Sequence, residues 1–271
     1  MIDDPNPQEW RELQAGVCRL FNELGLKADT EVKLSTPRGE VEIDVLGVDV
    51  GSVDKIRYIV ECKNWSSAIP QHVVHSFTTV MHETGANIGF IVSQKGLQAG
   101  AEKYTNNTNI VGMTYLELQA RYFPVWWERF FCRQIGDLAD ELVDFVSGHS
   151  ARCDELVAKL SPERAEHFES TRRCFGSFAL LMTHLNIGRF TNLTEWPGRD
   201  SLLLRPPESL DQYKRDVLNR FWSHFEWQRV STFRELMVMI KEILLEAQQM
   251  FREIFGGDID DAWERETAKM P

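Results

Sequence analysis

The sequence of 271 residues predicts an α/β fold in its first half, a mixed sheet flanked by helices, and an all-helical domain in its second half. Three observations carry this prediction. Polar and apolar residues alternate between residues 31 and 65, helical spacing alternates with short apolar runs between residues 70 and 123, and helical spacing alone continues from there. A chain of this length has room for two cores, so we expect domains at residues 1–122 and 123–271.

The first half opens with a predicted amphipathic helix over residues 7–24. Its apolar positions recur every three or four residues and predict a buried stripe, and Gly25 supplies a stop. The stripe consists of Trp10, Leu13, Val17, Leu20, Phe21 and Leu24. The next segments, "EVKLSTPRGEVEIDVLGVDV" and "KIRYIVECKNW", alternate around turn residues and predict a meander of three antiparallel strands.

Helices and strands alternate after Pro70. Helical spacing runs to Gly85, "NIGFIVS" predicts a strand, "GLQAGAEKYTNNT" a helix and "NIVGMT" a strand, and "YLELQARYF" opens another helix. The order strand, helix, strand predicts right-handed crossovers to parallel neighbours.

Helical patterns take over in the second half. They run through "WWERFFCRQIGDLADELVDFV", begin at Ser161, follow "PESL" and begin again at Thr232, where "TFRE" has the spacing of a capping box. Residues 188–207 are rich in Pro, Gly and Arg and predict a long irregular segment.

Composition narrows the class of protein. The net charge is -11, the apolar runs are too short to cross a bilayer, and five cysteines carry no C-x-x-C spacing. We therefore expect a cytoplasmic protein with reduced thiols and no membrane association. The acidity weighs against non-specific binding to nucleic acid but leaves room for a carboxylate site that works through a bridging metal.

The end of the strand "YIVECK" carries the candidate site. Residues two apart on a strand share a face, so Glu61 and Lys63 point the same way, and antiparallel pairing with the preceding strand could bring Asp44 beside Glu61. Asp44, Glu61 and the carbonyl of Cys62 would suit Mg²⁺ or Mn²⁺, and Lys63 could orient or deprotonate water or offset phosphate charge. The alternative is an ordinary strand-end ion pair.

Other residues are weaker candidates. His72 and His75 have ligand spacing without an evident third ligand, Ser93 and Gln94 end a parallel strand where substrate could bind, and Trp65 could stack on a base or cover the core. Five arginines could form an anion-binding surface or lie scattered: Arg172, Arg173, Arg189, Arg199 and Arg205.

Several stretches of the first half together resemble a known family. "WRELQAGVCRLFNELG", "GEVEIDVLG", "YIVECKNW", "VVHSFTTVMHETGANIGFIVSQKGLQAGAEKY" and "NIVGMTYLEL" resemble the Mrr-type restriction endonuclease domain of the PD-(D/E)XK nuclease superfamily. The resemblance covers about residues 7–120, and the helical half resembles no family that we can name.

The resemblance implies Mg²⁺-dependent hydrolysis of DNA phosphodiester bonds, often in defence against foreign DNA. Asp44, Glu61 and Lys63 match the catalytic aspartate, glutamate and lysine. The family commonly has a further glutamate on the first helix, eleven residues before the glycine that ends it, and here that position is Gln14. An amide can hydrogen-bond but supplies no negative charge.

Two hypotheses about function follow. The first is a metal-dependent endodeoxyribonuclease, a possible homodimer because a double-strand cut needs two sites, whose residues 123–271 recruit substrate, sense a signal, dimerise or bind a protein partner. The second is a catalytically weak or inactive module of the same fold that binds nucleic acid or a protein. Gln14 and the net negative charge favour the second hypothesis.

Overall fold

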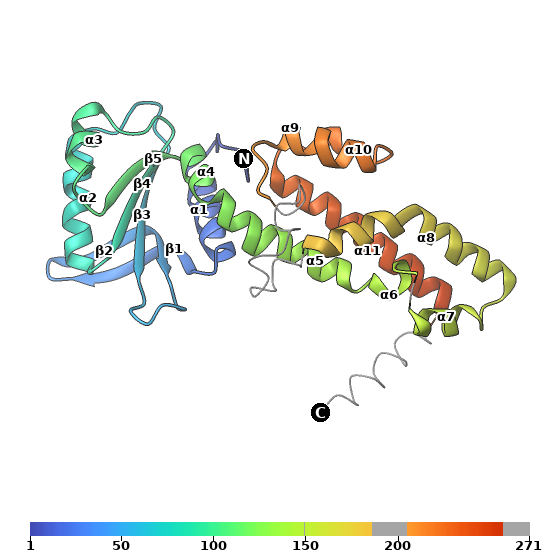
Figure 1. The fold of residues 1–271 in the computed structure, drawn as a ribbon. Helices are drawn as coiled ribbons and strands as arrows, with labels where there is room; N and C mark the ends of the chain where they lie inside the picture. Colours follow the sequence, from blue (N-terminus) through green and yellow to red (C-terminus); the bar gives the residue numbers. More distant parts are fainter. Residues whose placement is uncertain (149, 186–204, 257–271) are drawn as a thin grey trace. The chain divides into compact units, whose positions relative to one another are not determined.

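The structure is a computed structural model that describes residues 1–148, 150–185 and 205–256 (Figure 1). The chain divides into two compact units, Met1–Phe130 and Phe131–Pro271. Most of the irregular segment expected at residues 188–207 lies outside the described residues, as do Arg189 and Arg199.

The first unit is built on a five-stranded mixed sheet with the strand order β1-β2-β3-β4-β5. The strands are β1 Lys27–Thr36, β2 Gly39–Val48, β3 Arg57–Lys63, β4 Ile88–Ser93 and β5 Ile110–Thr114. The first three pair antiparallel and the last three pair parallel. The predicted meander with parallel crossovers is therefore confirmed.

Helices cover both faces of this sheet (Figure 1). They are α1 Trp10–Glu23, α2 Gln71–Thr84, α3 Ala99–Thr105 and α4 Tyr115–Trp126. On one face the ring of Phe21 from α1 makes edge contacts with Tyr58 of β3 and Phe90 of β4, at 6.0 and 6.2 Å between centroids. On the other face the next residues of these strands, Ile59 and Ile91, belong to a buried cluster with residues of α2. Alternate residues of each strand therefore pack into two cores, one on each face of the sheet.

Two glycines let the helices approach the sheet closely. A Cβ at Gly47 would lie 2.9 Å from the ring of Phe21, and one at Gly89 would lie 2.6 Å from the ring of Phe77. Both distances are shorter than van der Waals contact, so a larger residue would push the helix away from the strand.

One residue of the predicted buried stripe on α1 is exposed. Trp10 is 44% exposed, whereas Leu13, Val17, Leu20 and Phe21 are buried. The expectation that Trp10 is a core residue was wrong because α1 begins at Trp10 rather than at Pro7, and this first residue of the helix lies at the rim of the packed face.

The helix after β5 is less regular than predicted. Pro124 lies inside α4, and a π-helical turn follows at Trp127–Phe131. Proline has no N–H to donate within the helix, so the hydrogen-bond ladder is already interrupted where the wider turn begins.

The second unit is helical among its described residues, as predicted. Its α-helices are α5 Cys132–Asp140, α6 Val143–Val146, α7 Ala151–Val157, α8 Pro162–Thr183, α9 Leu210–Tyr213, α10 Asn219–Phe221 and α11 Phe233–Phe255. A further π-helical turn spans Lys214–Leu218 and a 3-10 turn spans Trp227–Arg229. The hydroxyls of Ser161 and Thr232 cap α8 and α11 by accepting backbone N–H bonds. The structure has the short helices α6, α7, α9 and α10 where the sequence pattern predicts longer helices or a loop.

Aromatic rings form much of the core of the second unit. Phe145 of α6 stacks on Phe251 of α11 at 5.1 Å between centroids, and Phe168 of α8 meets Phe255 of α11 at 5.4 Å.

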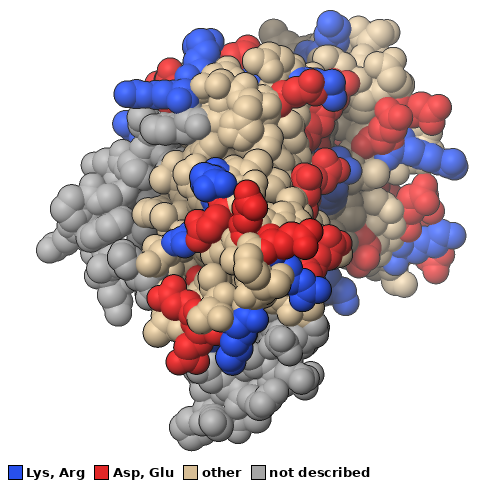
Figure 2. All heavy atoms as spheres, turned by 90° about the vertical axis from the view of Figure 1, so that its right-hand side faces the viewer, with Lys and Arg blue, Asp and Glu red and all other residues tan. Residues whose placement is uncertain are grey.

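On the face drawn in Figure 2, basic and acidic side chains are interspersed rather than gathered by sign. Arg172, one of the candidate anion-binding arginines, makes an ion pair with Glu169 at 3.8 Å.

Within the described ranges, none of the helices combines the length and the apolar character that a bilayer crossing requires.

Replacing Phe21 by alanine should destabilise the first unit strongly. Phe21 is fully buried and contacts rings of β3, β4 and α4, and truncating such a residue costs about 3–5 kcal/mol. Urea unfolding followed by circular dichroism should show the loss. Val53→Ala, at a residue 97% exposed, is the control and should change the free energy of unfolding by less than about 0.5 kcal/mol.

Candidate active site where β2 and β3 stop pairing

The candidate site begins where β2 and β3 stop pairing. Their antiparallel ladder ends with Val45 opposite Val60, so Asp44 and Glu61 are the next residues of the two strands. Beyond this point the carboxylate of Asp44 replaces the missing strand partner, because its Oδ2 accepts the backbone N–H of Cys62 at 2.7 Å. This bond holds the Asp44 side chain against the end of β3.

The backbone on the other side of Asp44 is also irregular. In the β1–β2 ladder, Thr30 pairs with Val45 and Val32 pairs with Ile43, and Glu31, which lies between them across from Asp44, has φ +54°. A residue in the left-handed region inside a strand interrupts the regular pleat. Asp44 is therefore flanked by an irregularity on β1 and by the end of the ladder on β3.

Gln14 of α1 completes the surroundings of Asp44. Its side-chain amide is buried, 3% exposed, and Nε2 donates to Asp44 Oδ1 at 2.9 Å. Both oxygens of Asp44 thus accept a hydrogen bond from the protein. The sequence predicts that Gln14 lies on the flank of the helix with Val17 and Phe21, but its partner on β2 becomes visible only in the structure.

Glu61 and Lys63 lie next to each other on β3 and form an ion pair, with side chains 27% and 26% exposed. Burial raises the pKa of Glu61 above its usual value, the hydrogen bond and charge of Lys63 oppose this rise, and the charge of Asp44 adds to it. Burial lowers the pKa of Lys63, but the hydrogen bond and charge of Glu61 and the charge of Asp44 outweigh it, so the pKa is raised. Each side chain thus favours the ionised form of the other.

The thiol of Cys62 is buried. Burial, followed by the charges of Asp44 and Glu61, raises the pKa of Cys62 well above its usual value, so the sulfur stays protonated at neutral pH. A contribution of Cys62 to a metal site would come from its backbone carbonyl, as the sequence suggests, and not from its sulfur.

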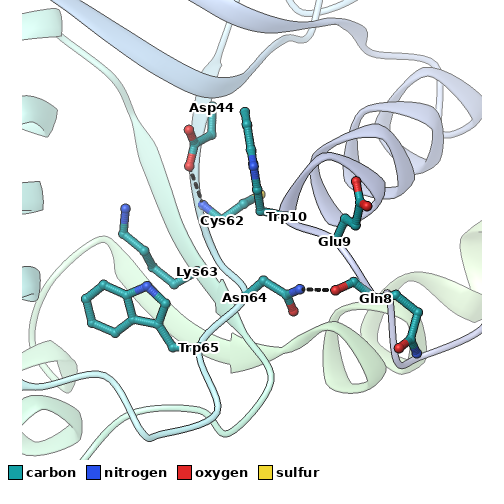
Figure 3. A pocket seen from close by; sticks show the side chains of 8 residues that line it. All are labelled: Gln8, Glu9, Trp10, Asp44, Cys62, Lys63, Asn64 and Trp65. Carbon is teal, nitrogen blue, oxygen red and sulfur yellow. Dashed lines mark hydrogen bonds between the residues drawn. The ribbon is translucent and has the colours of Figure 1, made fainter.

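A pocket of about 660 Å³ opens beside these residues (Figure 3). Three of the five predicted site residues, Asp44, Cys62 and Lys63, line it, whereas Glu61 and Gln14 do not. The other lining residues are Gln8, Glu9, Trp10, Asn64 and Trp65. Of these the sequence singled out only Trp65. Gln8 and Glu9 precede α1 and Trp10 is its first residue, and nothing in the sequence indicated that they lie near the motif. Asn64 directly follows "ECK", and this position was a signal that the sequence offered.

Asn64 ties the walls of this pocket together. Its Nδ2 donates to the carbonyl of Gln8 at 3.0 Å, and its Oδ1 accepts from Nε2 of Gln94 at 2.5 Å. One amide therefore links the segment before α1, the end of β3 and the segment that follows β4.

The remaining sequence candidates lie in ordinary structural contacts. His75 faces Gln71 at 3.2 Å between side-chain nitrogens and lies 4.4 Å from the ring of Tyr104. Ser93 is buried and its hydroxyl donates to the carbonyl of Gly96 at 3.3 Å, which closes the turn after β4. Among the described residues no cluster of three or more His, Cys, Asp or Glu side chains forms a metal site.

The donor atoms at Asp44 and Glu61 nevertheless suit a single hard cation. Each oxygen of Asp44 has accepted one hydrogen bond and retains a second lone pair, and carboxylate oxygens are the ligands that Mg²⁺ prefers. Because Mg²⁺ keeps several waters, two carboxylates are sufficient protein ligands. The amide of Gln14 adds no third charge.

Comparison with known proteins finds one family model that is similar to most of the first unit. Residues 6–121 match the family model Mrr_cat, described as "Restriction endonuclease", which is nearly the range of the resemblance found in the sequence. No curated protein matches the chain significantly. A solved structure titled "Crystal Structure of Protein of Unknown Function AF1548" shares 20% sequence identity over 61% of this chain and 97% of that chain, with a TM-score of 0.36.

Replacing Gln14 by glutamate should make stability depend on pH. The new carboxyl group would be buried against Asp44, so its pKa in the folded state would lie above its unfolded value of about 4.3. Such a group destabilises the fold at pH values at which it is ionised in the unfolded chain, and the loss at pH 7 should be about 1–3 kcal/mol. The deficit should shrink as the pH falls toward about 4.3.

Thermal unfolding at pH 7 and pH 4.5 measures this effect, and Mg²⁺ should recover part of the loss at pH 7 because it offsets the added charge. Gln228→Glu makes the same charge change at an exposed residue of the second unit and should show no such deficit. Equal stability of Gln14→Glu and wild type at pH 7 would contradict the contact between Gln14 and Asp44.

Proposed function

Because residues 6–121 match a restriction endonuclease family model, we propose that the chain is a Mg²⁺-dependent endonuclease that hydrolyses DNA phosphodiester bonds in the cytoplasm, in restriction or defence against foreign DNA. The observation that carries the proposal is the meeting of Asp44, Glu61 and Lys63 where the pairing between β2 and β3 ends. Ordinary ion pairs at strand ends do not require a buried amide and a strand N–H to hold the neighbouring carboxylate.

In this proposal Asp44, Glu61 and the carbonyl of Cys62 hold the metal. A bound Mg²⁺ supplies a Lewis acid for the phosphodiester and lowers the pKa of water. Gln14 and the N–H of Cys62 fix the direction of the Asp44 carboxylate, which reduces the reorganisation needed when the metal and substrate bind. Lys63 presents its ammonium group to the pocket, where it can donate hydrogen bonds to a phosphate oxygen and offset developing negative charge.

A second function is favoured by one contact. Gln14 stands where the family commonly has a glutamate, and its amide occupies one oxygen of Asp44. A module that binds DNA without metal and without cleavage would tolerate this amide, because it needs no additional negative charge. The homodimer and the roles suggested for residues 123–271 stay predictions.

Cleavage should depend on Lys63. Lys63→Ala should reduce the rate of plasmid cleavage with Mg²⁺ or Mn²⁺ by about 10²–10³-fold, because it removes a cation aimed at the reacting phosphate. Lys33→Ala changes an exposed lysine on β1 and should cleave at the wild-type rate. Equal cleavage by Lys63→Ala and Lys33→Ala would reject the proposed site.

Metal binding should depend on Asp44. Asp44→Asn keeps an acceptor for the N–H of Cys62 but removes the charge, so the fold should survive while the affinity for Mg²⁺ falls by at least about 10-fold. Isothermal titration calorimetry measures this affinity, and Glu42→Gln, at an exposed residue of the same strand, is the control. Tight DNA binding that is indifferent to metal and to Asp44 would favour the second function.

A further inference from the structure

Two exposed tryptophans set the candidate pocket apart from the rest of the described surface. Among described residues, the large hydrophobic side chains that are markedly exposed include only two aromatic ones, Trp10 at 44% and Trp65 at 42%. Both line the pocket next to Asp44 and Lys63. Exposing a tryptophan leaves a large apolar area in water, and such surface marks a place where a ligand or partner binds.

Each of these rings has a cation beside it. The ammonium nitrogen of Lys63 lies 5.9 Å from the centroid of the Trp65 ring, and the guanidinium carbon of Arg11 lies 5.2 Å from the centroid of the Trp10 ring. An aromatic ring with a positive charge over one face suits a nucleotide, because the base can stack on the other face while the phosphate contacts the cation.

The two rings also come from separate walls of the pocket. Trp10 stands at the start of α1 beside Asp44 and Cys62, and Trp65 follows β3 beside Lys63 (Figure 3). The bonds of Asn64 to Gln8 and Gln94 hold the two walls in place. The segments that carry the two rings are thus tied together beside the residues proposed to act on the phosphate.

We propose that this pocket binds unpaired nucleotides of the DNA strand that is cut, with their bases stacked on Trp10 and Trp65. This inference rests on the proposed function, because it takes DNA as the substrate. In a duplex the faces of each base are covered by its neighbours, so a side chain can stack on a base only where the strand is single, frayed or flipped out. The preferred substrate class is therefore single-stranded or locally unpaired DNA.

Binding of labelled oligonucleotides to the full chain, followed by fluorescence anisotropy in EDTA, tests the proposal without cleavage. Three probes share one sequence: a single strand, a full duplex, and a duplex with an unpaired internal bubble. The wild type should bind the single strand and the bubble at least about 5-fold more tightly than the duplex, in line with the stacking of one base.

Substitutions then test which residues cause the preference for unpaired DNA. Trp65→Ala and Trp10→Ala should each weaken binding of the unpaired probes by about 5- to 150-fold and change duplex binding little. Trp65→Phe keeps an aromatic ring and should retain part of the preference. Val53→Ala removes an exposed apolar residue outside the pocket and is the matched control. Because both tryptophans are exposed, thermal unfolding should show that the variants remain folded.

The outcomes separate this inference from the proposed function. Equal affinity for paired and unpaired probes, or binding by both alanine variants within about 2-fold of wild type, would overturn the stacking proposal even if cleavage depends on Lys63. A preference for unpaired DNA that both alanine variants lose supports it, even if the cleavage assay with Lys63→Ala fails. Tighter binding of the same single strand made as RNA would overturn the assignment to DNA.

Discussion

The hydrogen bond from the N–H of Cys62 to the carboxylate of Asp44 is the contact on which the arrangement of the site depends. It forms because β2 and β3 stop pairing after Val45 and Val60, which leaves a strand N–H without its usual acceptor. A side chain that takes over this acceptor role is held in the plane of the sheet, next to the end of β3. The sheet thus positions a charged group with the same donor that it uses for ordinary strand pairing.

The second contact of Asp44 connects the site to the core of the first unit. Gln14 lies on the same helix as Phe21, whose ring packs on β3 and β4. The burial of Phe21 fixes where α1 lies on the sheet, and this position in turn sets where the amide of Gln14 meets β2. The polar contact at the site and the apolar contact in the core therefore depend on the same helix placement.

Much of the fold follows from local patterns in the sequence. Strand alternation, helical spacing and the order of elements were enough to predict the mixed sheet, because each of these signals lies within a few neighbouring residues. The π-helical turn after Pro124 and the exposed position of Trp10 were not predictable in this way. They depend on where a helix starts and on how its hydrogen bonds adjust, and periodicity alone does not report either.

In the candidate site, too, local sequence patterns predict some contacts and not others. The shared face of Glu61 and Lys63 is a property of one strand, so sequence could place these two together, and the ion pair is present. The bond from Gln14 to Asp44 joins residues 30 positions apart, and that of Asn64 to Gln8 joins residues 56 positions apart. Contacts at such separations depend on the packing of whole elements, and neither spacing nor residue type predicts them without the fold.

The bridge at Asn64 has a consequence for how such a pocket could change over time. Three stretches of chain that are distant in sequence meet at one amide. The length of this one side chain therefore helps to set the distance between the segments that form the pocket. Glutamine, which keeps the amide but is longer by one methylene, would change this distance while the strands that hold the acidic groups stay as they are. A single substitution at this position could thus change ligand selectivity during evolution without disturbing the strands of the sheet.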